Sequence, residues 1–124
     1  MSLPLLVVDA ANVVGSVPDG WWRDRAAAAE RLRDALVDVT VPGVPGRVEV
    51  VLVVEGAARG VDGVPGVRVV AALGSGDDTI VDVVASAGPQ RRTLVVTADR
   101  GLRARVAALG AEVLGPRSVP RRPA

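Results

Sequence analysis

Acidic residues follow four of the apolar stretches of this chain, and they are its strongest candidates for chemistry. Each of these stretches ends in an acid or is followed by one after a short turn: Asp9, Glu55, the pair Asp77 and Asp78, and Asp99. Carboxylates that gather in one place repel one another, and burial adds a desolvation cost to each charge. A site that holds three or four of them therefore needs a bound cation or must retain protons.

The residue types that the 124-residue chain lacks narrow this chemistry further. It contains no cysteine and no histidine, which excludes zinc sites of the Cys/His kind, cysteine nucleophiles, histidine general bases and Ser-His-Asp triads. The remaining catalytic groups are carboxylates, arginines, hydroxyls and any metal ion held by oxygen atoms. Oxygen-only ligation selects Mg²⁺ or Mn²⁺.

The apolar pattern predicts the elements that must position these acids. Short runs bounded by turn residues predict five strands, at residues 5–8, 48–54, 67–73, 93–96 and 113–114. Apolar residues at three- and four-residue steps predict helices at 21–39, at 77–87 and from Asp99 to Gly110. The two alanines after Asp9 are not expected to begin a helix, and residues 56–66 are expected to form a loop with at most one helical turn. Strands that are apolar on both faces and alternate with helices predict a single-domain, three-layer α/β fold with a parallel sheet.

A parallel sheet would bring the acids together, because all its strands end at the same edge, where open α/β folds place their ligands. Asp78 and Asp82 are four residues apart on one predicted helix, so they lie about 40° apart around its axis. Each acid also has an ordinary interpretation. Asp77, Asp78 and Asp99 stand where acids cap helices, Asp82 is a solvated surface acid, and Glu55 is a loop acid. Asp9 is the hardest to explain in this way, because it ends an apolar run.

Three segments resemble the motifs of a known family, the NYN branch of the PIN-like nucleases. The segment 8–13, with Asp9 and Asn12, resembles the family's D-x-x-N opening. The segment 76–82 resembles its mid-chain motif, in which an acid opens a helix and a second acid follows four residues later. The segment 96–99 resembles its closing T-x-D motif, and Glu55 stands where the family often has an acid after the second strand. The resemblance covers roughly residues 5–114, with the motifs in the family's order.

The resemblance implies a sheet with strand order 3-2-1-4-5 and a ribonuclease that depends on Mg²⁺ or Mn²⁺. It implies that the metal ligands are Asp9, Asp78 and Asp99. Asp82 would be a further acid of the catalytic site, and Asn12 and Thr97 would orient water or ligands. From the residues alone, Asn12 is equally well a turn residue and Thr97 a helix cap.

Two features depart from the family's pattern. The second-strand acid is Glu55 rather than the more usual aspartate, so its carboxylate reaches one methylene further. Asp77 stands beside Asp78, which leaves open which of the two faces the metal. We favour Asp78, because its spacing to Asp82 matches the motif, and keep Asp77 and Glu55 as additional acids.

RNA is the partner that this interpretation requires, and an acidic pocket for an anionic substrate needs basic surroundings. All 15 basic residues of the chain are arginines, which suit phosphate contact. The candidates for RNA contact flank the expected strand ends: Arg23, Arg25, Arg59, Arg100 and Arg103. Trp21 and Trp22 either stack on bases or pack at the start of a helix. With so few aromatic residues, we expect single-stranded RNA to be bound with low sequence specificity.

The expected organisation is one domain at residues 1–115, followed by a poorly ordered Arg- and Pro-rich tail at 116–124. We expect a cytoplasmic protein, because no apolar run is long enough for a membrane span and the start lacks the pattern of a signal peptide. Whether the protein forms a homodimer is left open.

Three other functions share the expected fold. A non-catalytic PIN-like module that binds RNA or a protein partner would keep the same architecture. A phosphatase or nucleotide hydrolase with Asp9 as nucleophile usually has a second acid two residues later and a nearby lysine. Position 11 is alanine here, and the chain contains no lysine. The missing lysine also argues against a receiver-type signalling domain.

Overall fold

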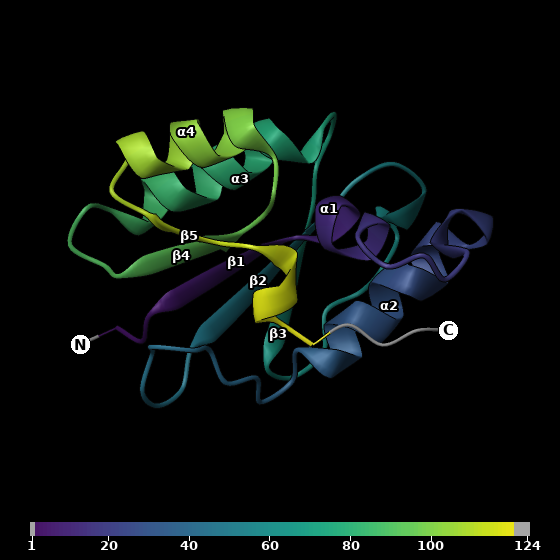
Figure 1. Cartoon of the computed structure of the whole chain (residues 1–124), viewed down its shortest axis with the longest axis horizontal. Helices are drawn as coiled ribbons and strands as arrows, with labels where there is room; N and C mark the ends of the chain where they lie inside the picture. The colour runs from purple at the N-terminus through teal and green to yellow at the C-terminus, as the bar shows by residue number, and fades with distance from the viewer. Residues whose placement is uncertain (1, 121–124) are drawn as a thin grey trace.

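The computed structural model, which describes residues 2–120, contains one sheet of five parallel strands. The order across the sheet is β3-β2-β1-β4-β5, as expected. The strands are β1 (Leu5–Asp9), β2 (Glu49–Val54), β3 (Val67–Ala71), β4 (Thr93–Val96) and β5 (Glu112–Leu114). The strand that comes first in the chain therefore lies at the centre of the sheet (Figure 1).

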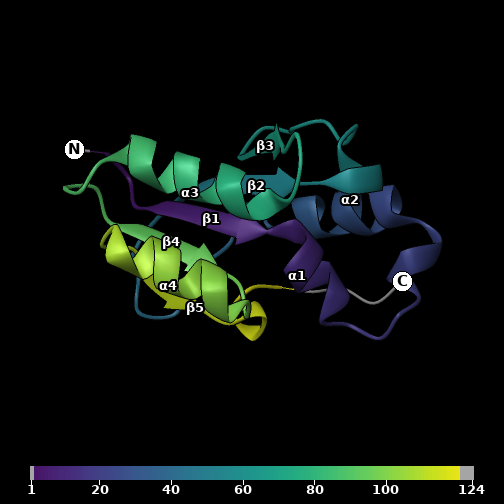
Figure 2. The ribbon, with the colours of Figure 1, turned by 90° about the horizontal axis from the view of Figure 1, so that it is seen from above.

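Helices cover both faces of the sheet and complete the three expected layers. They are α1 (Ala10–Gly15), α2 (Arg25–Ala35), α3 (Gly76–Ala87) and α4 (Arg100–Ala108). Three short 3₁₀ turns accompany them: η1 (Trp21–Arg23), η2 (Gly56–Ala58) and η3 (Pro116–Ser118). Seen from above, α3 and α4 lie side by side over one face, while α1 continues from the end of β1 towards the α2 side (Figure 2).

The strand residues alternate between two hydrophobic cores because successive side chains of a strand point to opposite faces. Leu6 and Val8 belong to the core under α1 and α2, together with Leu32 of α2 and Leu36, which follows the end of that helix. Leu5 and Val7 belong to the core under α3 and α4, whose helical members are Ile80, Val84, Leu102 and Val106. Both faces of β1 are thus buried, which is why its run is apolar throughout.

The register of the strands decides which residues reach the carboxyl edge together. Asp9 is level with Val53 of the neighbouring strand β2, so Glu55 lies two residues beyond the level of Asp9. Val8 is level with Val96, which makes Thr97 the neighbour of Asp9 on the other side. The parallel sheet therefore brings the end of β1 between the ends of β2 and β4.

Two helix boundaries differ from the expectation. Helix α1 begins directly after Asp9, whose side chain accepts a hydrogen bond from the backbone N–H of Asn12 and so caps the helix. The segment expected as one helix at 21–39 is divided into η1 and α2, and Asp24 caps α2 by accepting from the N–H of Ala27 at 2.9 Å. In both places an aspartate satisfies an otherwise unpaired N–H of a first turn, which starts a helix that the apolar spacing did not reveal.

The tail also differs from the expectation as far as the structure describes it. Residues 116–118 form η3, and Val119 is only 4% exposed within the core under α1 and α2. The domain therefore extends beyond residue 115. The rest of the expected tail, at 121–124, lies outside the described residues. Within residues 2–120, the helices are too short and too polar to span a bilayer.

The burial of Val119 predicts that the chain loses stability when its last segment is removed. Truncation after residue 115 should lower the free energy of unfolding by about 1–3 kcal/mol, because it uncovers apolar surface of the core. Val119→Ala in the full chain should lose part of the same free energy, and Arg117→Ala, at an exposed position of η3, is the matched control that should keep it. Urea unfolding followed by circular dichroism measures all three proteins. Equal midpoints for Val119→Ala and Arg117→Ala would show that Val119 does not contribute to the core.

Candidate functional site

Asp9 is a carboxylate held at the edge of the central strand with little access to water. It is 6% exposed. One oxygen accepts a hydrogen bond from the hydroxyl of Thr97 at 2.9 Å, and the other accepts from the N–H of Asn12 at 3.4 Å. Burial raises the pKa of Asp9, and the nearby charges of Asp77 and Glu55 raise it further, against the lowering effect of the two hydrogen bonds. The ionised form is thus present at a cost.

Thr97 and Asn12 build the frame around Asp9. The Thr97 hydroxyl, which donates to Asp9, also accepts from the N–H of Asp99 at 3.2 Å. The side-chain oxygen of Asn12 accepts from the N–H of Ala98 at 2.9 Å. These bonds tie the start of α1 to the loop after β4, so both residues fix the protein's own backbone. Their expected role in orienting water or ligands stays a prediction.

Asp99 and Asp77 stand at the starts of two different helices, α4 and α3. Asp99 is exposed and caps α4, where one of its oxygens accepts from the N–H of Leu102 at 2.9 Å. Asp77 is half-buried in the first turn of α3. Burial raises the pKa of Asp77, and repulsion from Asp99 and Glu55 adds to this rise. The two acids therefore share one electrostatic environment although they belong to different helices.

Glu55 joins the end of β2 to the start of α3. Its Oε2 accepts a hydrogen bond from the N–H of Gly76, the first residue of α3, at 2.7 Å. A carboxylate at a helix N-terminus satisfies a free N–H and opposes the helix dipole. Because its charge is felt by both Asp9 and Asp77, Glu55 belongs with them. We call Asp9, Glu55, Asp77 and Asp99 the acid cluster.

Asp78 and Asp82 do not lie where the motif spacing placed them. The Asp78 side chain is 80% exposed and forms an ion pair with Arg105 of α4 at 2.9 Å. Asp82 is exposed and lines a separate groove with Glu49, Arg68 and other residues, away from the acid cluster. Adjacent helical residues point about 100° apart, so only one of the pair at 77–78 can face the sheet edge. That residue is Asp77, which corrects the preference for Asp78.

The chemistry of the acid cluster is that of hard oxygen donors. Four carboxylates from four separate segments are coupled by repulsion, since Asp77 and Glu55 act on Asp9 and Asp99 acts on Asp77, and the chain has no histidine or cysteine to accompany them. Within residues 2–120, however, no three acidic side chains stand close enough together to form a ready-made ion site. The ligand set fits Mg²⁺ or Mn²⁺ by type, while its side chains would have to close around an ion.

The arginines expected to contact RNA fall into two groups. Arg103 is half-buried, and its Nε donates to the carbonyl of Thr97 at 2.8 Å, so it supports the loop that carries Asp99. The other four are exposed: Arg23, Arg25, Arg59 and Arg100. Both Arg23 and Arg25 lie over tryptophan rings, with 5.8 Å from Arg23 to Trp22 and 5.0 Å from Arg25 to Trp21 between guanidinium carbon and ring centre.

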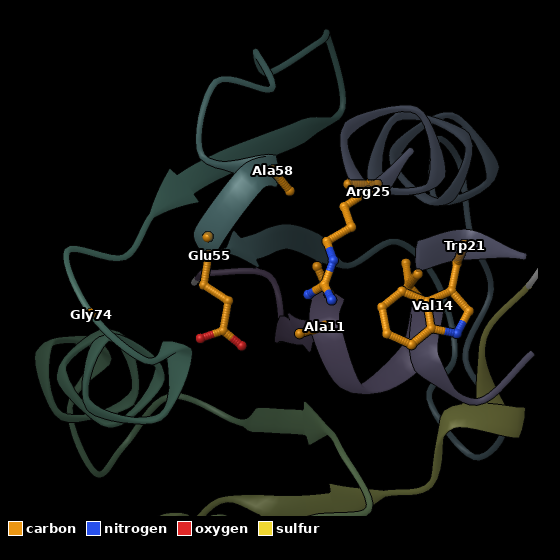
Figure 3. Close-up of a pocket in the computed structure, with 10 residues that line it drawn as sticks. Ala11, Val14, Trp21, Arg25, Glu55, Ala58 and Gly74 are labelled. Carbon is orange, nitrogen blue, oxygen red and sulfur yellow. The ribbon is translucent and has the colours of Figure 1, made fainter. Parts of the chain in front are cut away.

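A pocket beside the acid cluster was not foreseen from the sequence. It has a volume of about 310 Å³ and lies between α1, η1, α2 and the segment after β2. Figure 3 shows Glu55 and Arg25 reaching into it from opposite sides, with Trp21 forming a wall next to Arg25. Its floor consists of small side chains, among them Ala10, Ala11 and Ala29. Alanines at these helical positions were the available signal, because they leave space where larger residues would fill it.

Comparison with known proteins supports the fold but does not assign a function. No family model matches the sequence, and no curated protein matches it. Among solved structures, the chain is similar to a mutant of Rae1 (YacP) from Bacillus subtilis, with a TM-score of 0.67 and 18% identity. The match covers 95% of this chain and 72% of that one. The chain thus has the PIN-like α/β fold that its motifs predicted.

The raised pKa of Asp9 predicts that its charge destabilises the folded protein. The folded state binds more protons than the unfolded chain above the ordinary carboxyl pKa of 3.8, so the free energy of unfolding falls as pH rises through the range between the two values. Asp9→Asn removes the charge and keeps an oxygen to cap α1, since Asn caps as well as Asp. In metal-free buffer at pH 7 the variant should therefore melt at or above the wild-type temperature.

The difference between wild type and Asp9→Asn should shrink as pH is lowered towards 4, because Asp9 of the folded protein then takes up a proton and loses its charge. Asp82→Asn is the matched control and should follow the wild-type profile, since Asp82 is exposed and lies apart from the acid cluster. Thermal melts between pH 4 and 8 measure both variants. An Asp9→Asn protein that is less stable than wild type at pH 7 would contradict this account of the site.

Proposed function

We propose that this protein is a ribonuclease that hydrolyses RNA phosphodiester bonds with Mg²⁺ or Mn²⁺ at the acid cluster. The observation that carries the proposal is Asp9, a buried carboxylate whose pKa is raised by burial and by the neighbouring acids Asp77 and Glu55. A fold gains no stability from such an arrangement. Repelling carboxylates at the ligand-binding edge of a parallel sheet are typical of a site that a cation completes.

The ligand acids in this proposal are Asp9, Asp77 and Asp99, with Glu55 beside them. They differ from the set that the motif implied by the exchange of Asp78 for Asp77, which follows from the ion pair of Asp78 with Arg105. A divalent ion bound there would supply an activated water and neutralise charge on the scissile phosphate. No side-chain nucleophile is needed, in keeping with the lack of cysteine and histidine.

The remaining residues of the site hold these acids in place. The Thr97 hydroxyl donates a hydrogen bond to one oxygen of Asp9, which fixes the orientation of that carboxylate. Asn12 and Thr97 together join the segments that carry Asp9 and Asp99. Hydrolysis by this route should leave 5′-phosphate and 3′-hydroxyl ends.

RNA as the substrate rests on the sequence motifs and on the exposed arginines. The motifs at 8–13, 76–82 and 96–99 resemble those of the NYN branch, and the PIN-like fold is compatible with that resemblance. Four of the arginines that were expected to contact RNA are exposed and can contact phosphates: Arg23, Arg25, Arg59 and Arg100. Because such contacts do not read bases, we propose single-stranded RNA with low sequence specificity.

A non-catalytic RNA-binding module is the second candidate, and one observation favours it. Among the described residues, no three acidic side chains already surround a common point. A protein that only binds RNA would have no need to bring them closer. Metal binding and cleavage separate the two candidates.

Cleavage of RNA should require both the divalent ion and Asp9. Purified protein with Mn²⁺ or Mg²⁺ should cut a fluorescent, unstructured RNA, and excess chelator should stop the reaction. Asp9→Asn should lower the rate by at least about a hundredfold, as expected when a metal ligand is lost. Gel analysis of the products checks the rate and the end chemistry. Undiminished cleavage by Asp9→Asn would refute the proposed site, and absence of cleavage with either ion would favour the binding module.

The neighbouring aspartates of α3 provide a sharper comparison. Asp77→Asn should abolish cleavage and weaken the stabilisation by Mn²⁺, which amounts to about 1.4 kcal/mol when the free ion is at tenfold its dissociation constant. Asp78→Asn is the matched control and should keep both, because it loses only an exposed ion pair with Arg105. Thermal melts with and without Mn²⁺, together with the cleavage assay, measure the pair. The reverse pattern would restore Asp78 as the ligand.

A further inference from the structure

The geometry points to the pocket beside the acid cluster as a binding site for one unpaired base of the RNA strand, with preference for bases that carry an amino group. We call it the Trp21 pocket. Its functional residues are Trp21, Arg25 and Glu55, and its floor includes Ala10 and Ala11. The inference deepens the proposed function and rests on it for the identity of the strand as RNA.

The size and lining of the Trp21 pocket suit a flat, partly apolar ligand. Its volume of about 310 Å³ is at the lower end of the roughly 300–1,000 Å³ of small-molecule sites. It therefore has room for one nucleotide but not for a folded peptide or a duplex. Alanines and Val14 give it smooth apolar walls, which match the face of a base.

The two charged groups of the pocket lie on opposite sides of it, so one can contact the edge of a base and the other its sugar-phosphate. Arg25 lies over the Trp21 ring, with 5.0 Å from its guanidinium carbon to the ring centre, so a planar cation covers this wall of the pocket. Glu55 enters from the opposite side (Figure 3). Within residues 2–120, no ion pair joins Arg25 to Glu55, so each remains available to a ligand. Unpaired bases are commonly held in this way, by a stacking plane and hydrogen bonds to their edge.

The chemistry of Glu55 sets the preference. An ionised carboxylate only accepts hydrogen bonds, and its Oε2 already accepts from the N–H of Gly76. The amino groups of adenine, cytosine and guanine are donors, whereas uracil presents carbonyl oxygens on either side of its single N–H. Glu55 should therefore favour the amino-bearing bases over uracil.

The position of the pocket makes it part of the strand's path. Ala10 and Ala11 directly follow Asp9, so the floor of the pocket starts at the acid cluster. Next to Trp21 in η1, Trp22 is 54% exposed and carries Arg23 over its ring. A strand with one base in the pocket could thus place a phosphate near Asp9 and a neighbouring one near Arg23.

Binding of nucleotides without metal tests the pocket apart from cleavage. With isotope-labelled protein in chelator, AMP should shift the indole N–H of Trp21 and the amide N–H of Gly76 in NMR spectra. UMP should bind severalfold more weakly. Glu55→Gln, whose amide can donate to a carbonyl, should reverse that preference. Equal binding of AMP and UMP by wild type, or shifts that leave Trp21 unaffected, would overturn the assignment.

Filling the pocket provides a variant that should still fold. Ala11 is exposed on α1, and Ala11→Leu keeps a good helix former while occupying the floor. It should weaken AMP binding roughly tenfold or more, because the added side chain occupies space that the base needs, a loss on the scale of one stacked base. Ala107→Leu, at an exposed position of α4, is the matched control and should bind as wild type does. Unchanged AMP binding by Ala11→Leu would show that the ligand lies elsewhere.

A short strand distinguishes RNA from a free nucleotide as the natural occupant. The single-stranded RNA UUAUU should bind more tightly than AMP, because its phosphates also reach arginines outside the pocket. Equal affinity would make the pocket a mononucleotide site and overturn the RNA assignment. If the protein cuts RNA with Mn²⁺ but Trp21 does not respond to AMP, the pocket inference fails while the proposed function stands. If Trp21 responds to AMP but no RNA is cut, the pocket binds bases as inferred and the proposed nuclease function fails.

Discussion

The buried carboxylate of Asp9 is the constraint on which the carboxyl edge of this sheet depends. Asp9 lies at the end of the central strand with almost no solvent exposure, and it keeps its place through the hydroxyl of Thr97 and the backbone of α1. The energetic penalty of that carboxylate grows with every further acid nearby. The elements around it nevertheless bring Glu55 and Asp77 close enough to raise its pKa, and Asp99 acts on Asp77 in the same way. The arrangement adds nothing to stability, and this is the reason for the proposal that a cation completes it.

Three acids of the cluster also bind backbone N–H groups at the starts of helices. Their interpretation as helix caps is therefore compatible with a common role in the proposed site. Asp9 caps α1, Asp99 caps α4, and Glu55 accepts from the first N–H of α3. Each uses one oxygen for the protein's own backbone. Among the hydrogen bonds of the described residues, Asp99 and Glu55 each accept with one carboxylate oxygen only. The second oxygen of each is left for other contacts. Helix capping thus fixes the positions of the carboxylates without using up their capacity to bind.

Much of the fold could be predicted from the sequence, because buried parallel strands have a plain signature. The runs at 5–8, 48–54 and 93–96 consist almost entirely of apolar residues, and the structure places strands there in the expected order. Short helices that start at an aspartate were harder. Helix α1 has only 6 residues, too few for a periodic pattern, and its start depends on the hydrogen bond between Asp9 and Asn12. Likewise, the spacing of Asp78 and Asp82 could not reveal that Arg105, on another helix, holds Asp78 away.

Strand β1 passes directly into α1 at Asp9, with no loop residue between them that could absorb a change in length. One inserted residue between Asp9 and Ala10 would rotate the whole of α1 by about 100°, and with it Asn12 and the floor of the pocket. The segment after η2 is less constrained, since residues 59–66 belong to no helix or named strand and only Val61 among them is buried. Added sequence can thus enlarge the surface on the β2–β3 side. The β1–α1 junction, in contrast, tolerates no change in length.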